Sequence, residues 1–413
     1  MANKMMGARV LYISQYYDPE QPSVRWQSLT EGLVRRGYRV QVLTSFPSYP
    51  LGRVFPGYKA KLFQRDMMNG VEVLRVPSFP SKDKNIIKRM FTYLSFSISA
   101  CVIGVFVVRR PAAIMAYHPP ATVSIPVLFY KTIYRAPATY DIQDIWPDTL
   151  FDSGVMSENW VARVIGRYMK VVYKSVNHIS VITEGFFAKL VERGVSPAKM
   201  SVIHNWSIDT GDGQIDESVS DRFKEKTTIL FAGTMGKAQG LDAVVDAFER
   251  FQQLGYPKDT LGLYFLGIGT ERDELANRCE KKNISNVYFW DLVPANKVKS
   301  YLLAANVLLV HLKNSPLFKI TVPGKFQTYC AMGKPILSGV GGEVEQMVKQ
   351  SKCGWTFEPE NVDELCKCFV TIVNCAKEDF VKKGEAAKAL YAATFEKEAG
   401  IDRFDEALRK LMK

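Results

Sequence analysis

The stretch VPGKFQTYCAMGKPILSG, residues 322–339, joins a glycine-lysine turn to a predicted helix and then to an apolar strand. Gly324 lets backbone N–H groups approach an anion, and Lys325 adds a positive charge beside it. The helix predicted over residues 326–332 turns the positive end of its dipole to the same place. The alternative is a plain helix-to-strand turn with Lys325 in solvent. In both cases the stretch is a unit of an α/β domain.

Similar units fill the rest of the chain, and their strands are uniformly apolar, which is typical of strands covered on both faces. The predicted strands cover residues 9–14, 40–45, 71–76, 113–117, 139–142, 179–183 and 201–204, and then 228–233, 262–267, 286–290, 307–311, 335–340 and 355–358. We therefore predict an α/β fold with two Rossmann-like, doubly wound parallel sheets.

The polar segment SIDTGDGQIDESVSDRFKEK, residues 207–226, is the predicted linker between the two domains. The N-terminal domain then covers residues 1–206 and the C-terminal domain residues 227–395. Residues 396–413 are predicted to form a last helix, for which packing back on the N-terminal domain is one arrangement. With 413 residues, 47% hydrophobic and 23% charged, the chain is a typical globular protein.

Metal chemistry has little support in the sequence. Seven cysteines and four histidines lack the spacing of a zinc site, and no Asp-x-Asp pair follows a predicted strand. We therefore expect reduced thiols in a cytoplasmic protein, no metal and no other cofactor. The N-terminus enters a strand directly, without the pattern of a signal peptide.

The net charge of +12 lies entirely in the first half, since residues 1–210 hold 26 Lys and Arg against 14 Asp and Glu. Such a surplus marks either a solvated basic face or contact with an anionic surface. Residues 91–108 are uncharged and apolar, which predicts a helix packed on the sheet; a membrane-spanning segment is the alternative. We expect contact with anionic lipid and not with nucleic acid, through basic residues on both sides of this run: Lys84, Lys88, Arg89, Arg109 and Arg110.

Several segments in sequence order resemble the family-4 retaining glycosyltransferases of bacterial surface-polysaccharide and lipid-linked oligosaccharide synthesis. They are YISQYYDPEQPSVRWQSLTEGLVRRGYRVQVLTSFPSYPLG, DIQDIWPD, VITEGF, VIHNW, FAGTMGKAQGLD, LGIGTERDEL and PGKFQTYCAMGKPIL. The resemblance implies a GT-B fold, with two domains facing a cleft. It further implies a nucleotide-sugar donor bound mainly by the second domain, and we interpret this donor as a UDP sugar. The first domain would bind a polyprenyl-diphosphate-linked glycan at the cytoplasmic face of the membrane.

The expected donor site follows strand ends of the second domain. Its residues are Gly233, Thr234, Gly236, Lys237, Gly267, Gly269, Leu292, Val293, Gly324, Lys325 and Thr328. Lys237 and Lys325 are also expected to act in catalysis, by neutralising the leaving diphosphate without metal. The chain departs from the family at Thr234 and Gln239, where many members have arginine and lysine. It departs again at Ile320 and Thr328, where many have two glutamates, and at residues 21–23, where relatives often have Gly-Gly.

In the first domain, His118 and Asp144 follow predicted strands and are candidate catalytic residues. His118 would hydrogen-bond the transferring sugar, and Asp144 would orient the acceptor or stabilise positive charge at the anomeric carbon. A neutral histidine beside prolines and an Asx turn or helix cap are the alternatives. Glu184 is a further candidate, and Trp146 and Trp206 are either sugar-stacking platforms or core residues.

Two other functions fit the same architecture. A UDP-sugar 2-epimerase would need several acid-base groups around the sugar, and the second domain places few carboxylates near its strand ends. A non-catalytic scaffold at the membrane surface would follow if the missing glutamates abolish donor binding. Release of UDP only when an acceptor is present separates the transferase from both.

Overall fold

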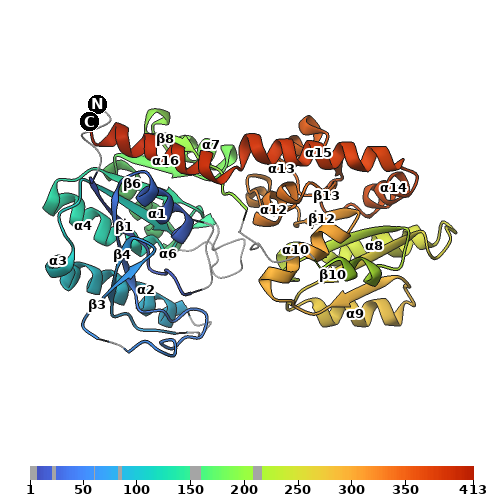
Figure 1. Cartoon of the computed structure of the whole chain (residues 1–413), viewed down its shortest axis with the longest axis horizontal. Helices are drawn as coiled ribbons and strands as arrows, with labels where there is room; N and C mark the ends of the chain where they lie inside the picture. Colours follow the sequence, from blue (N-terminus) through green and yellow to red (C-terminus); the bar gives the residue numbers. More distant parts are fainter. Residues whose placement is uncertain (1–6, 21–24, 60, 82–85, 149–159, 208–215) are drawn as a thin grey trace. The chain divides into compact units, whose positions relative to one another are not determined.

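The computed structural model describes residues 7–20, 25–59, 61–81, 86–148, 160–207 and 216–413. The chain forms two compact units (Figure 1). Unit 1 holds residues 1–205 and 397–413, and unit 2 holds residues 206–396. Each predicted strand is present, and its ends lie within two residues of the expected ones.

Unit 1 is built on an eight-stranded sheet in the order β3-β4-β2-β1-β5-β6-β7-β8. The strands are β1 Arg9–Ile13, β2 Arg39–Ser45, β3 Gln64–Met68, β4 Val71–Val76, β5 Ala113–His118, β6 Ala138–Ile142, β7 His178–Val181 and β8 Met200–Val202. All pairs are parallel except β3 and β4, so the prediction of a purely parallel sheet was wrong at this edge. Asn69 and Gly70 both have positive φ, as a tight hairpin turn requires, and this Asn-Gly signal was overlooked.

Helices cover both faces of this sheet. They are α1 Trp26–Arg35, α2 Ile86–Val102, α3 Gly104–Val107, α4 Ser124–Tyr134, α6 Trp160–Ser175 and α7 Glu184–Glu192, with the last helix, α16 Lys397–Leu411. The predicted helix over residues 91–108 is thus two helices, α2 and α3, and α2 begins before residue 91. Among the described residues, no helix is both long and apolar enough to cross a bilayer.

Helix α16 packs on α1 within unit 1 (Figure 1). Arg36 forms ion pairs with Glu398 at 3.0 Å and with Asp402 at 2.5 Å, and the Tyr38 hydroxyl donates to Asp405 at 2.6 Å. A Cβ on Gly32 would lie 2.6 Å from a methyl carbon of Ile401, so the two helices approach closely because position 32 is glycine.

Unit 2 has a six-stranded, entirely parallel sheet in the order β11-β10-β9-β12-β13-β14. Its strands are β9 Thr227–Ala232, β10 Leu261–Leu266, β11 Val287–Trp290, β12 Val307–His311, β13 Ile336–Gly339 and β14 Gly354–Thr356. Its helices are α8 Leu241–Gln252, α9 Arg272–Lys281, α10 Ala295–Ala304, α11 Pro316–Lys319, α12 Gly324–Met332, α13 Glu343–Ser351, α14 Val362–Val373 and α15 Lys377–Thr394. The expected doubly wound α/β class is confirmed for both units.

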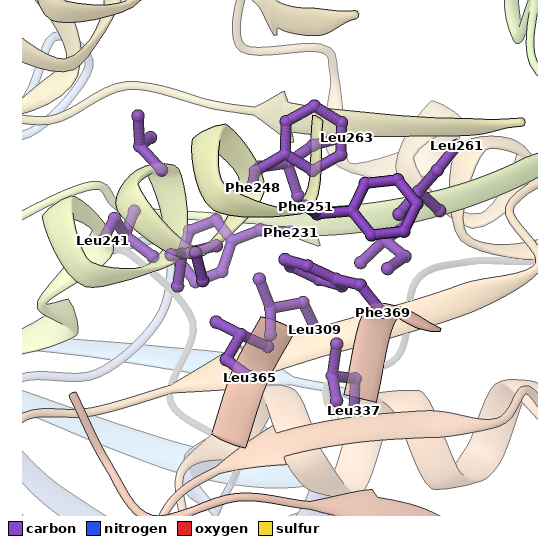
Figure 2. Packing of buried hydrophobic residues seen from close by; sticks show 14 of the residues in the cluster. Phe231, Leu241, Phe248, Phe251, Leu261, Leu263, Leu309, Leu337, Leu365 and Phe369 are labelled. Carbon is purple, nitrogen blue, oxygen red and sulfur yellow. The ribbon is translucent and has the colours of Figure 1, made fainter. Parts of the chain in front are cut away.

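One face of this second sheet packs on α8 and α14. Phe248 and Phe251 of α8 meet Phe369 of α14, with ring centroids 5.8 and 6.1 Å apart (Figure 2). Burial of such large side chains holds the sheet against α8 and α14, and this packing also positions the loops that leave the carboxyl ends of the strands.

Part of the predicted linker belongs to unit 2. The 3₁₀ helix η4 Glu217–Arg222 follows Asp216, whose N–H donates to the Ser300 hydroxyl at 2.9 Å. Val219 is buried, and the Arg222 guanidinium lies 4.7 Å from the ring centroid of Trp290. Val219 and Arg222 therefore anchor this polar segment on unit 2, while residues 208–215 lie outside the described residues.

Candidate functional site

In each sheet, some of the candidate residues lie near the point where the strand order reverses. In unit 2 the reversal lies between β9 and β12, and in unit 1 between β1 and β5. Loops leave the carboxyl ends of these strands in opposite directions, which opens a crevice for ligands in doubly wound folds.

In unit 2, two glycine loops lie against each other at this edge. The N–H of Gly233 donates to Leu266 O at 2.8 Å, and the N–H of Met235 donates to Ile268 O at 2.9 Å. A Cβ on Gly267 would lie 2.3 Å from Gly233 O, and one on Gly269 would lie 2.0 Å from Met235 O. These two glycines therefore allow the loops to pack, which is a structural reason for their presence.

Lys325 reaches this pair of loops from the β12 side. Its Nζ lies 3.5 Å from the ring centroid of Phe231 and 3.5 Å from Thr234 O. A Cβ on Gly233 would lie 2.7 Å from Lys325 Cε, so a larger residue at position 233 would displace the lysine from this position. Burial lowers the pKa of Lys325 to about 7. Binding of an anion would restore the charged form, because an opposite charge favours it.

Lys237 begins a short 3₁₀ helix, η5 Lys237–Gln239, and its side chain is exposed. It lines a cavity of about 260 Å³ together with Lys313, Arg278, Glu271 and Asp242. Lys325 is not among the residues that line this cavity. The structure therefore brings both lysines to the same loop, residues 233–237, but not into one common pocket.

His311 forms hydrogen bonds that hold the end of this turn, and it was not selected from the sequence. Its Nδ1 lies 2.6 Å from Gln239 O, and its Nε2 accepts the N–H of Glu360 at 3.1 Å. Burial lowers the pKa of the ring, so His311 is neutral and Nδ1 carries the proton that Gln239 O accepts. His311 thus ties the turn that carries Lys237 to the segment after β14.

Other expected donor residues surround the start of α12. Gly324 is its first residue, and the Thr328 hydroxyl donates to Gly324 O at 3.1 Å. Leu292 is exposed, and Val293 packs against the core. Gln327, which the sequence did not single out, is buried, and its Oε1 has no hydrogen-bond partner among the described residues.

In unit 1, His118 is fully buried at the end of β5. Neither ring nitrogen has a hydrogen-bond partner in the described part of the chain. The ring contacts Tyr140 and Trp146 at centroid distances of 5.5 and 5.6 Å. Burial lowers the pKa of His118 to about 3, so the ring is neutral at physiological pH and can both donate and accept one hydrogen bond.

The other first-domain candidates differ in their surroundings. Burial raises the pKa of Asp144 to about 6. Glu184 is the first residue of α7, whose cap is Thr183, and Trp146 and Trp206 are both buried. Their burial favours the core interpretation of the two tryptophans.

Three buried polar residues of unit 1 escaped the sequence reasoning. Arg25 donates to both Asp141 and Ile203 O, and Asp141 also accepts from the Ser180 hydroxyl at 2.8 Å. Gln15 follows β1, is fully buried, and neither atom of its amide has a partner among the described residues. His118 is the last residue of β5 and Gln15 lies two residues after β1, and these two strands are neighbours at the reversal point. A polar residue at the end of a buried strand was the available signal.

Two family models together match most of the chain. One describes a glycosyl transferase 4-like domain and matches residues 22–206; the other describes glycosyl transferases group 1 and matches residues 226–375. The chain is a glycosyltransferase of GT-B type.

Individual proteins resemble this glycosyltransferase over almost its whole length. The putative colanic acid biosynthesis glycosyl transferase WcaI of Escherichia coli (strain K12) is 22% identical over 388 residues, which are 91% of this chain and 89% of WcaI. The structure of Anabaena HepE in complex with UDP and glucose has a TM-score of 0.66 at 14% identity, covering 98% and 100% of the two chains. Sucrose-phosphate synthase from Thermosynechococcus elongatus has a TM-score of 0.69 at 14% identity, covering 98% and 99%. At these identities the two solved structures show the fold of the glycosyltransferase and no more.

Proposed function

We propose that the glycosyltransferase moves a sugar, with retention of configuration, from a UDP sugar to a polyprenyl-diphosphate-linked glycan. The reaction would belong to cell-surface polysaccharide synthesis, such as that of an O-antigen, a capsule or an exopolysaccharide. The similarity to the putative colanic acid glycosyl transferase WcaI supports the polysaccharide, and the similarity to HepE, whose structure holds UDP and glucose, supports the nucleotide.

The observation that carries the proposal is the position of Lys325. Its ammonium group lies over the ring of Phe231 and beside the backbone of Gly233 and Thr234, at the strand reversal of unit 2. The start of α12 adds the N–H groups and the dipole of a helix N-terminus. A diphosphate bound here would be stabilised as it leaves, and Lys237 would add a second positive charge from the same loop. Thr328 would hydrogen-bond the ribose, and Leu292 and Val293 would contact the donor.

In unit 1, the neutral His118 would hydrogen-bond the transferring sugar, because its buried nitrogens have no partner among the described residues. The Asp144 carboxylate would stabilise positive charge at the anomeric carbon. Retention needs no protein nucleophile in this scheme: the leaving phosphate accepts the proton of the acceptor hydroxyl on the face from which it departs.

The remaining parts of the proposal concern partners. We expect no cofactor and no metal, because two lysines and a helix N-terminus would balance the diphosphate. The glycosyltransferase would work in the cytoplasm, on the inner face of the membrane, with no nucleic acid as a partner. Chelation by EDTA should leave turnover unchanged; loss of turnover that Mg²⁺ or Mn²⁺ restores would contradict this.

The test has a binding step and a turnover step. First, a panel of nucleotides and nucleotide sugars is screened for thermal stabilisation. A ligand at 100 times its Kd adds about 2.7 kcal/mol to the free energy of unfolding. Lys325→Ala should abolish the shift, whereas Lys382→Ala, on the exposed surface of α15, should keep it. Second, UDP release from the best donor is measured with and without lipid-linked glycans. Lys325→Ala should lower the rate by about thirty- to a thousandfold, or about 2 to 4 kcal/mol. Conversion of the donor sugar without any acceptor would indicate an epimerase. If no nucleotide binds, the non-catalytic scaffold at the membrane surface is the remaining hypothesis.

A further inference from the structure

Helix α2 presents a stripe of large apolar side chains to solvent, although its other side is buried. Phe91, Ile98 and Val102 are 62%, 60% and 61% exposed. On the opposite side Thr92 and Ser97 are buried, and the Ser97 hydroxyl donates to Thr122 O at 2.8 Å. Spacings of seven and four residues place the three apolar side chains on one stripe of the helix. Phe96 and Ala100 are buried on the side of Thr92 and Ser97, so packing on the sheet does not account for the exposed apolar stripe.

The exposed apolar surface continues onto two neighbouring segments. Phe106 of α3 is 86% exposed. The Arg65 guanidinium of β3 donates to Val107 O at 3.4 Å, so β3 lies beside α3. Met67 is exposed on the same side of β3 as Arg65, because side chains two residues apart share a face. On the α2 side, the N–H of Phe79, which is also exposed, donates to the Ser95 hydroxyl at 2.8 Å. We call the surface formed by the exposed side chains of Met67, Phe79, Phe91, Ile98, Val102 and Phe106 the α2–α3 face. Figure 1 labels α2, α3 and β3, which carry most of it.

The charges around the α2–α3 face are almost all positive. Between residues 53 and 110, the exposed cations among the described residues are Arg53, Lys59, Lys61, Arg65, Lys88, Arg109 and Arg110. The described acids of this segment are Asp66 and Glu72, and both are partly buried. Each pairs with an arginine, Asp66 with Arg75 at 3.3 Å and Glu72 with Arg65 at 3.1 Å. Lys84 lies outside the described residues.

We infer that the α2–α3 face is a docking surface for an anionic lipid bilayer. The apolar stripe would enter the boundary between headgroups and acyl chains, and the surrounding cations would contact acidic headgroups. A protein partner would cover the apolar stripe equally well, but the uncompensated positive charge favours a surface dense in negative charge. The inference does not depend on the proposed reaction, because it involves none of the residues assigned to donor or sugar.

Vesicle binding by the whole protein, without any donor or acceptor, tests the inference. Vesicles of phosphatidylcholine alone are compared with vesicles that contain one quarter phosphatidylglycerol, at low and at high salt. Wild-type protein should bind only the anionic vesicles, and high salt should weaken binding, since it shortens the Debye length. Arg109→Glu with Arg110→Glu should weaken binding by at least about 25-fold, because each basic residue near the surface contributes about fivefold. The control pair Lys367→Glu with Lys382→Glu makes the same change in charge on exposed positions of unit 2 and should have little effect.

A second pair of variants tests the apolar stripe. Ile98→Ser with Phe106→Ser should weaken binding at least about tenfold at both salt concentrations, whereas Val171→Ser, at an exposed position of α6, should not. In addition, Phe106→Trp should gain fluorescence that brominated lipids quench, and Val171→Trp should not. Circular dichroism and melting temperature establish that each variant folds. Wild-type indifference to anionic vesicles would overturn the inference. So would equal losses in the control variants, or a wild-type dimer in solution that the Ile98 and Phe106 substitutions dissociate.

Discussion

Nucleotide affinity should fall as the pH rises through 7, because Lys325 must be protonated to bind a diphosphate. Burial lowers the pKa of Lys325 to about 7 in the free protein. A bound diphosphate would return this pKa at least to the ordinary value of a lysine, about 10.4. Between these two values, binding takes up one proton, so each unit of pH weakens affinity by up to tenfold.

The size of the effect follows from these two pKa values. From pH 7.0 to 8.5, the protonated fraction of free Lys325 falls from about one half to about one thirtieth, while the bound form stays protonated. The Kd for UDP should therefore rise about 15-fold, or about 1.6 kcal/mol. This window lies above the second ionisation of the phosphate, near pH 6, so the charge of the ligand changes little.

Isothermal titration calorimetry with UDP measures both the Kd and the proton uptake, the latter from buffers of different ionisation enthalpy. Lys325→Arg is the matched variant, because arginine stays charged over the whole range. It should show a nearly constant Kd, whereas Lys237→Ala should bind more weakly and keep the pH dependence. A flat Kd in the wild type, or the same slope in Lys325→Arg, would refute the assignment of this proton to Lys325.

Three further predictions concern residues away from Lys325. The pKa of Asp144 is about 6, so turnover should fall as the pH drops through 6 and the carboxylate is protonated; Asp144→Asn should be slow at every pH and lose this limb of the pH-rate profile. His311→Phe should raise the KM for the donor more than it lowers kcat, by about five- to a hundredfold in kcat/KM. It removes two hydrogen bonds that hold the turn of Lys237, and His311→Gln should recover part of the loss. Arg25→Met should lower the free energy of unfolding by about 3 to 5 kcal/mol in urea titrations, because it leaves the Asp141 carboxylate buried without its cation. Arg25→Met with Asp141→Leu should be clearly more stable than Arg25→Met alone; equal stability would contradict a charge effect.

The sequence by itself determined the α/β architecture of both units. Strands buried on both faces are apolar at almost every position, so runs such as residues 307–310 are visible without any knowledge of their neighbours. Polar residues at the ends of these strands were visible for the same reason, and His118 is one of them. Lys325 was visible from the glycine turn that begins α12. Strand β3 was missed because its side chains alternate between partly buried and exposed positions at the sheet edge, although Asn69-Gly70 marked its turn.

Only the tertiary structure decided which of these residues meet. Arg25 and Asp141 are 116 residues apart in sequence, and His311 and Gln239 are 72 apart; no local pattern links either pair. The orientation of α2 was likewise undecided, because its sequence carries an apolar stripe and a hydroxyl stripe, and helical periodicity does not say which of them faces the sheet. The side with Thr92, Phe96 and Ser97 is buried, where Thr122 O accepts a hydrogen bond from Ser97, and the stripe of Phe91, Ile98 and Val102 is left on the surface. Local periodicity fixes the elements of this fold, whereas packing between distant segments fixes the partners of each polar group.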